Sequence, residues 1–286
     1  MIKAFVPIYR TFYQYMEKRA FARRSKQKTK TQKQGLVLSV TSIEPRLSTL
    51  HLAINRVIRN GFTPDVIEVW LDHSLNEKIP PELKSMENDG VRINFIDDIG
   101  PYTKLYYAVQ RHPESAIITI DDDIFLPRGS LEELVGQSKK YPNTVICNRA
   151  KKITVDASGN PKPYREWPVM KCGTPHPCIN ILPLGTGSVY YPPGIFDHRF
   201  FDISLFKKLS PTGDDLWFTA MRILNGAMAY NTGFYKRREI SIPKTGKYCI
   251  KYRHGQRGNN DESILRIWKE LRLSSYFTQN NSHFII

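Results

Sequence analysis

The sequence predicts an α/β fold, with a mostly parallel central sheet and helices on both faces, in one domain that follows a basic helical arm. Strand-like and helix-like segments alternate over the first half of the 286-residue chain, and polar residues stand where four strands end. In open parallel sheets, ligands bind beyond the carboxyl ends of the strands. The four polar strand ends therefore predict one binding site.

The first 34 residues are expected to form a basic arm. They hold ten Lys or Arg and one Glu, so +9 of the net charge of +15 lies there. Apolar residues recur at helical spacing over residues 1–24, whereas residues 25–34 contain none and are typical of a flexible linker. Two interpretations stay open. The helix lies on an anionic membrane surface, or it packs on the domain by its aromatic face. The spaced residues are Phe5, Tyr9, Phe12, Tyr13, Met16 and Ala20.

Bulk features bound the class of protein and its compartment. No apolar run approaches the length of a membrane-spanning helix, and the N-terminus lacks the pattern of a secretory signal. Four scattered cysteines are too few for a disulfide framework, which agrees with a reducing compartment. We expect a cytoplasmic protein, with peripheral attachment to the inner face of the cell membrane through residues 1–34 as a further expectation.

Residues 35–127 are expected to form a nucleotide-binding half. Strands are predicted at 36–40, 66–71, 91–96 and 116–120, with helices that begin at Pro45 and near Lys104. The residues that follow these strands are Thr41 and Ser42, Asp72 and His73, Asp97 and Asp98, and the aspartates 121–123. Because parallel strands end at one edge of the sheet, these side chains are expected to lie close together.

The strongest single motif is the aspartate triplet Asp121, Asp122 and Asp123. It follows an apolar, β-branched run that is typical of a strand buried on both faces. Adjacent buried carboxylates repel one another, so a cation is expected there, and a divalent ion shared with substrate phosphates fits best. If strand alternation continues, Asp121 and Asp123 share a face and Asp122 points away. The simpler alternative is a solvated acidic turn.

Residues 128–258 are expected to form the acceptor half, and residues 259–286 a C-terminal helix and tail. A helix is predicted at 131–140 and a strand at 144–147, followed by a long loop region over 150–186. A Gly-rich turn over 183–188 then precedes an apolar run. No phosphate-binding loop and no dinucleotide fingerprint is present in the sequence, which argues against P-loop nucleotidases and dinucleotide enzymes.

A second acidic pair, Asp214 and Asp215, stands at the start of a helical pattern over 214–224. Helix capping explains an aspartate at this place without any function. A helix N-terminus also lowers a carboxyl pKa, so a catalytic base here would need burial or nearby negative charge. Further along, residues 243–257 form a basic segment with interleaved Gly and Tyr, suited to close over an anionic ligand or simply solvated.

Together these features resemble the GT-A glycosyltransferases, most closely bacterial family-2-like enzymes of cell-surface polysaccharide synthesis, with a fainter likeness to the exostosin C-terminal domain. The resemblance covers roughly residues 36–258 and depends on the strand 36–42, the triplet 121–123 and the segment 213–218. It implies a hexosyl or related transferase that moves a sugar from a nucleotide-sugar, with a UDP-sugar favoured, to a glycan or lipid-linked acceptor, in capsule or lipopolysaccharide synthesis.

The same resemblance implies the site residues. A Mn²⁺ or Mg²⁺ ion would be bound by Asp123, with Asp121 and His254 as further ligands, and Asp214 or Asp215 would act as the base for the acceptor hydroxyl. Whether the reaction inverts or retains configuration stays open. The residues expected to bind the nucleotide-sugar are Thr41, Ser42, Arg46, Asp72, Lys104, Asp121, Asp122, Gly187, Lys251 and Arg253.

Two other functions remain alternatives at this stage. A metal-dependent phosphohydrolase or nuclease would use the same triplet with water as the nucleophile. A non-enzymatic nucleic-acid-binding protein would use the basic arm, but the sequence shows no recognition helix or RNA-binding signature, and the acidic strand ends would repel phosphates. We therefore expect no nucleic-acid partner.

Overall fold

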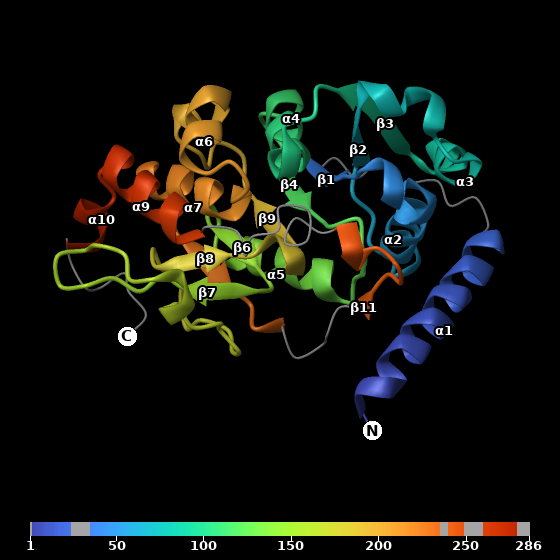
Figure 1. Cartoon of the computed structure of the whole chain (residues 1–286), viewed down its shortest axis with the longest axis horizontal. Helices are drawn as coiled ribbons and strands as arrows, with labels where there is room; N and C mark the ends of the chain where they lie inside the picture. The colour runs from blue at the N-terminus through green and yellow to red at the C-terminus, as the bar shows by residue number, and fades with distance from the viewer. Residues whose placement is uncertain (1, 24–34, 235–239, 249–259, 279–286) are drawn as a thin grey trace.

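The computed structural model describes residues 2–23, 35–234, 240–248 and 260–278. Its centre is a seven-stranded sheet in the order β10-β6-β9-β4-β1-β2-β3 (Figure 1). All neighbouring strands are parallel except β9, which runs antiparallel to both β4 and β6. The seven strands are β1 Leu36–Thr41, β2 Val66–Asp72, β3 Val91–Ile96, β4 Ala116–Thr119, β6 Val145–Cys147, β9 Val189–Tyr191 and β10 Ala229–Asn231.

Two small antiparallel sheets complete the strands. One pairs β5 (Ile124–Phe125) with β11 (Ile240–Ser241), and the other pairs β7 (Ala150–Lys152) with β8 (Ile181–Pro183). The α-helices are α1 Ile2–Ala22, α2 Leu47–Arg59, α3 Pro81–Lys84, α4 Thr103–Arg111, α5 Ser130–Lys140, α6 Ile203–Leu209, α7 Asp214–Leu224, α9 Asn260–Leu271 and α10 Ser274–Thr278.

Helices cover both faces of the central sheet, as the sequence predicted. Strand β1 shows why: Leu38 and Val40 point into one apolar core, and Val37 points into the other. The first core contains buried side chains of α2, α3 and α5, and the second contains those of α4, α6, α7 and α9. A strand apolar on both faces requires this double cover, so the predicted fold class is confirmed.

The first four strands and the helices α2 and α4 lie where the sequence predicted, whereas α3 was not predicted and the second half contains more structure than expected. The loop region predicted over 150–186 includes β7 and β8, and the short apolar run after the Gly-rich turn is β9. Strand β9 inserts between β4 and β6, so it completes the sheet beside the strand that leads to the aspartate triplet. Three-residue strands have no detectable alternation, which explains why they were missed.

Helix α1 lies along one side of the domain (Figure 1) and contacts α2 and β5. The ring of Tyr13 packs against Phe125, with 5.4 Å between the ring centroids. The buried carboxylate of Glu17 forms ion pairs with Arg59 at 2.7 Å and Arg56 at 3.2 Å. The helix therefore packs on the domain, which is one of the two interpretations of its sequence. No helix in the described ranges is long and apolar enough to cross a membrane.

Candidate functional site

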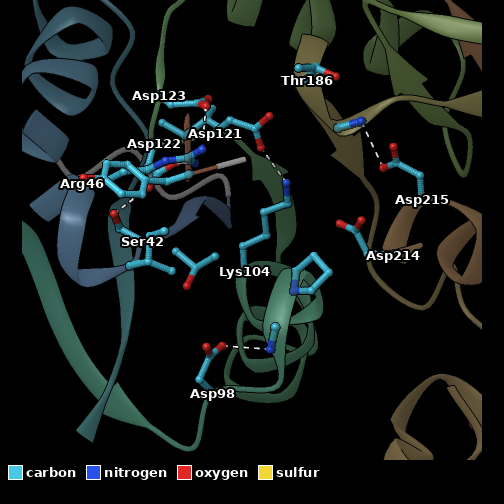
Figure 2. Close-up of a pocket in the computed structure, with 17 residues that line it drawn as sticks. Ser42, Arg46, Asp98, Lys104, Asp121, Asp122, Asp123, Thr186, Asp214 and Asp215 are labelled. Carbon is cyan, nitrogen blue, oxygen red and sulfur yellow. Dashed lines mark hydrogen bonds and ion pairs between the residues drawn. The ribbon is translucent and has the colours of Figure 1, made fainter. Parts of the chain in front are cut away.

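A cavity of about 440 Å³ lies at the carboxyl ends of the parallel strands β1 and β4. It is shown in Figure 2, where the triplet lies on one side and the pair Asp214 and Asp215 on the other. Six aspartates and two cationic side chains line it. The lining residues are Thr41, Ser42, Ile43, Arg46, Asp98, Gly100, Pro101, Lys104, Ile120, Asp121, Asp122, Asp123, Gly185, Thr186, Asp214, Asp215 and Tyr248.

The aspartate triplet forms a turn between β4 and β5 and is bound by Arg46. The guanidinium contacts Asp122 at 2.7 Å and Asp123 at 3.0 Å, and the Ser42 hydroxyl donates to the second oxygen of Asp122. Strand pairing ends at Thr119, so the expected alternation does not govern these residues. Asp122 is the buried member and accepts the Ser42 hydrogen bond, but all three aspartates line the cavity, so Asp122 does not point away from it as expected.

Lys104 lies between the two acidic groups (Figure 2). Its ammonium contacts Asp121 at 2.7 Å, and its side chain is almost fully buried. The backbone of Lys104 is fixed from β1 and β2, because its carbonyl accepts from the Ser39 hydroxyl, which in turn accepts from the Trp70 indole. The first turn of α4 therefore holds a permanent positive charge at the centre of the cavity.

Burial raises the pKa of the Asp123, Asp214 and Asp215 carboxyl groups. The pKa of Asp123 rises to about 6, because of burial and the neighbouring Asp121. Burial also raises the pKa of Asp214 to about 6, although Lys104 opposes the shift. The pKa of Asp215 lies well above its usual value, because the group is buried beside Asp214. Lys104 and Arg46 therefore do not neutralise the cavity.

Asp214 and Asp215 are the first two residues of α7, and neither caps the helix, since Gly213 holds the cap position without a side-chain bond. Asp215 accepts a hydrogen bond of 3.0 Å from the backbone N–H of Gly185, which fixes the Gly-rich turn to the start of α7. Asp214 has the burial that a catalytic base at a helix N-terminus requires. A Cβ atom at Gly185 would lie 3.2 Å from both Asp215 and Lys104, so only glycine fits comfortably there.

The loop before α7 is tied to the start of α4. The hydroxyl of Tyr102 donates to the Ser210 carbonyl, and the Ser210 hydroxyl donates to the Gly213 carbonyl at 2.9 Å. Tyr102 also stacks on Phe206 of α6 at 4.0 Å between ring centroids. These contacts set the distance between the two acidic sides of the cavity, because α4 carries Lys104 and α7 carries Asp214.

The segment 240–248 forms another wall. The backbone N–H of Ile242 donates to the Asp123 carbonyl at 2.7 Å, and Arg46 reaches the Thr245 carbonyl at 3.4 Å. Tyr248 lines the cavity at the end of this segment. Lys251, Arg253 and His254, expected to bind the donor and the metal, lie outside the described residues.

Most of the remaining predicted residues gather in this cavity. The lining includes Thr41, Ser42, Arg46 and Lys104 with both aspartate groups. Asp72 does not line it; its carboxylate accepts from Ser74 and from the backbone of Asp98. Gly187 does not line it either, and its backbone lies so close to Arg149 that a Cβ would come within 2.6 Å. The Gly-rich turn instead contributes Gly185 and Thr186.

Sequence reasoning missed several lining residues. Asp98 was recognised as a strand end but not as a site residue; it accepts from Gly100 N–H at 2.8 Å and from the Thr103 hydroxyl at 2.9 Å, which shapes the turn into α4. The Gly100-Pro101 turn after it gave a signal that could have been used. Thr186 belongs to the Gly-rich turn and Tyr248 to the basic segment 243–257, both of which the sequence marked without singling out these two residues, and Ile120 ends the predicted strand 116–120. Ile43 gave no signal.

The donor chemistry of the cavity suits a hard divalent cation. Within the described ranges, no group of three or more His, Cys, Asp or Glu side chains is arranged to hold a metal ion. Such a cage is not required, because Mg²⁺ is commonly held by one or two carboxylates together with substrate phosphates. Asp121 and Asp123 are partly exposed to the cavity and have too few cationic neighbours to balance the acidic cluster. The residues present therefore fit the ion.

Comparison with known proteins gives structural likenesses only. No protein-family model matches the chain, and no curated protein matches it. Among solved structures, it is similar to GalNAc-T7, crystallised with UDP, GalNAc and Mn²⁺, with 13% identity and a TM-score of 0.45 over 70% of this chain and 42% of that one. It is also similar to residues 1–349 of S. aureus TarS, with 14% identity and a TM-score of 0.44 over 70% of this chain and 62% of that one.

Both of these structures are GT-A glycosyltransferases, and this chain spans less than two thirds of the length of each. The architecture of the chain itself, a seven-stranded and mostly parallel sheet with helices on both faces, is consistent with a GT-A fold. Because the identities are 13% and 14% and both TM-scores lie below 0.5, these likenesses carry no argument about this chain. What the chain does has to be inferred from its cavity.

Proposed function

We propose that this protein is a metal-dependent glycosyltransferase that takes a sugar from a nucleotide-sugar donor. The observation that carries the proposal is the charge of one cavity, in which, among the residues that the structure describes, six aspartates face a single Arg and a single Lys at the carboxyl ends of parallel strands. A site of this kind gains most from a ligand that brings divalent positive charge together with phosphates. A nucleoside diphosphate joined to a sugar supplies the phosphates.

The two acidic sides have different roles in this proposal. On one side, Asp121 and Asp123 would hold Mn²⁺ or Mg²⁺, which stabilises the negative charge of a diphosphate leaving group when bound. On the other side, Asp214 accepts the proton of the acceptor hydroxyl, because it is half-buried and its pKa of about 6 keeps it largely ionised at neutral pH. Asp215 positions the Gly185 turn through its hydrogen bond to the backbone.

Lys104 and Arg46 orient this machinery. Lys104 keeps Asp121 turned toward the cavity and adds a positive charge between the donor and acceptor sides. Arg46 holds Asp122 and Asp123 together through two contacts. The turn at Asp98, with Thr41 and Ser42, would contact the nucleoside, and Thr186 would face the sugar. A UDP-sugar is the first donor to test, and a glycan or lipid-linked acceptor in cell-surface polysaccharide synthesis is the proposed second substrate.

The proposal is tested by thermal unfolding of the full chain against UDP, GDP, CDP and ADP, each with and without Mn²⁺. The variant is Asp123→Ala, and the matched control is Glu114→Ala, an exposed carboxylate at the opposite end of the same strand. At about a hundred times its Kd, a ligand adds about 2.7 kcal/mol to the free energy of unfolding. We expect one nucleotide to stabilise the wild type and the control only with Mn²⁺, and to leave Asp123→Ala unchanged.

Two results would contradict the proposal. In one, no nucleotide changes the unfolding temperature of any variant. In the other, the wild type turns over phosphate esters rapidly with water and no acceptor, which would assign the same carboxylates to a phosphohydrolase. A transferase should instead hydrolyse its sugar donor slowly and consume it quickly once an acceptor hydroxyl is added.

A further inference from the structure

Helix α1 carries an exposed apolar stripe on the side that faces away from the domain. Residues 9, 12, 16, 19 and 23 are spaced alternately by three and four, so their side chains lie along one side of a helix. The first three are Tyr9, Phe12 and Met16, and Tyr15 lies beside them. The exposed fractions are 55% for Tyr9, 59% for Phe12, 53% for Tyr15 and 47% for Met16.

This concentration of exposed apolar area is confined to one helix. Within the described ranges, seven large apolar side chains are strongly exposed, and four of them belong to α1. The aromatic residues of the arm therefore divide between two faces. Tyr13 packs on the domain, whereas Tyr9 and Phe12 face outward. An exposed apolar cluster rimmed by polar groups is typical of an interaction surface.

The charged residues on the outer side of the same helix are basic. Arg19 and Arg23 continue the stripe after Met16, and both are exposed. The single acidic residue of α1, Glu17, is buried on the opposite side and paired with Arg56 and Arg59 of α2. Residues 24–34 add five Lys or Arg and no acidic residue to the sequence that follows.

We propose that the outer face of α1 docks on an anionic lipid surface, with the helix axis parallel to the membrane. Tyr9, Phe12, Tyr15 and Met16 would enter the headgroup region, where amphipathic aromatic rings are favoured, and Arg19 and Arg23 would contact lipid phosphates. A second copy of this chain fits less well, because two such faces would bring the same arginines together with no exposed carboxylate on α1 to pair with them.

The helix that carries this surface packs against the segment that follows the aspartate triplet. The packed face of α1 contacts Phe125, which is two residues after Asp123. Arg56, held by Glu17, also donates to the carbonyl of Leu126 at 3.3 Å. A helix lying on a membrane would therefore hold the segment that follows the triplet beside the lipid surface. The docking surface consists of residues of α1 alone, so a test of lipid binding does not depend on the proposed transferase activity.

The first experiment places a reporter on the stripe. All four native tryptophans are buried in the domain, so the indole introduced by Phe12→Trp is the accessible one. The full-length variant is mixed with vesicles of phosphatidylglycerol or of phosphatidylcholine, each with and without lipids brominated on the acyl chain. We expect a blue shift and bromine quenching with phosphatidylglycerol, and little change with phosphatidylcholine.

The second experiment removes the surface and leaves the domain intact. Phe12→Ser with Met16→Ser removes the apolar part, and Arg19→Glu with Arg23→Glu reverses the charged part. The matched controls are Leu265→Ser, an exposed apolar residue of α9, and Lys207→Glu with Lys208→Glu on α6. In vesicle sedimentation, each α1 variant should bind phosphatidylglycerol at least about tenfold more weakly, and each control should bind like the wild type.

Three outcomes would overturn the proposal. The wild type does not sediment with phosphatidylglycerol vesicles, or the α1 variants sediment as well as the controls. In the third, the α1 variants change the oligomeric state in sedimentation velocity, or the binding of RNA, while vesicle binding stays at the wild-type level. That result would assign the stripe to a second copy or to a nucleic acid. Circular dichroism of each variant shows that the fold is retained.

Discussion

Two acidic sites in this molecule are built in opposite ways. Near β2 and α4, one fully buried carboxylate, Glu68, accepts from Asn94 at 2.6 Å and His112 at 2.8 Å, with Arg92 and Arg111 each at 3.7 Å. In the cavity, six carboxylates face two cations. The first cluster has more positive partners than it needs, and the second has too few.

The difference separates a structural cluster from a functional one. A buried charge that is surrounded by donors is satisfied in the folded protein and requires nothing from outside. Burial and mutual repulsion raise the pKa of a carboxyl group, and its ionised form then destabilises the folded protein. Such groups are common where a ligand is bound. Neutralising one carboxylate should therefore raise the free energy of unfolding when the carboxylate is in the cavity, and lower it when the carboxylate is Glu68.

The largest expected effect is on turnover by Asp214→Asn. Removing a general base lowers the rate by about 10²- to 10⁴-fold, and an amide of the same shape cannot accept the proton. The measurement is transfer of labelled sugar from the donor identified by thermal unfolding to an acceptor. Because Asp214 must be ionised to act, the wild-type rate should rise with pH through about 6. A variant with unchanged turnover would move the base to another residue.

The second-largest effect is on stability: Asp214→Asn, which lowers turnover, is expected to make the folded protein more stable. The pKa of Asp214 is raised from 3.8 to about 6 by burial, so the folded protein binds more protons than the unfolded chain between these values, and stability falls as pH rises through this range. At pH 7 and without metal, Asp214→Asn should raise the free energy of unfolding by about 2 to 3 kcal/mol. Denaturant unfolding at pH 4 and pH 7 measures it, and a gain equal at both pH values would contradict the cause.

The smallest effect is expected at the structural cluster. Glu68→Gln should lower the free energy of unfolding by about 1 to 3 kcal/mol, because His112 and the two arginines lose a charged acceptor. The variant should keep wild-type turnover when assayed well below its unfolding temperature. If Glu68→Gln stabilises the protein, or reduces turnover as strongly as Asp214→Asn, the distinction between the two clusters is wrong.

Much of the fold and part of the site could be predicted from the sequence for a local reason. Strands β1 to β4 are short segments rich in apolar and β-branched residues, and a residue that follows a parallel strand is placed by the strand itself. Ser42 and the triplet were therefore expected together although Ser42 and Asp122 are 80 positions apart in the sequence. Lys104 and Arg46 were expected near the donor, and the structure shows them as the cations that bind the triplet.

What the sequence did not reveal depends on contacts between distant segments. Strand β9 pairs with β4 and β6, which are distant from it in the sequence. A strand of three residues contains no periodicity from which these pairing partners could be predicted. The hydrogen bond between Gly185 and Asp215 arises only once that strand is in place. The two faces of α1 were also unresolved, because aromatic spacing alone does not tell which ring packs on Phe125.

The cavity wall formed by residues 240–248 and the strand β1 differ in their stability against local opening, because of how β11 pairs with β5. Each strand has two residues, and a sheet of this size is not stable by itself; it persists because Ile242 is buried against the core. Such a unit opens with a free energy below that of global unfolding, whereas the amides of β1 exchange with solvent only when the whole domain opens. We therefore expect the amides of β11 to exchange with solvent faster than those of β1.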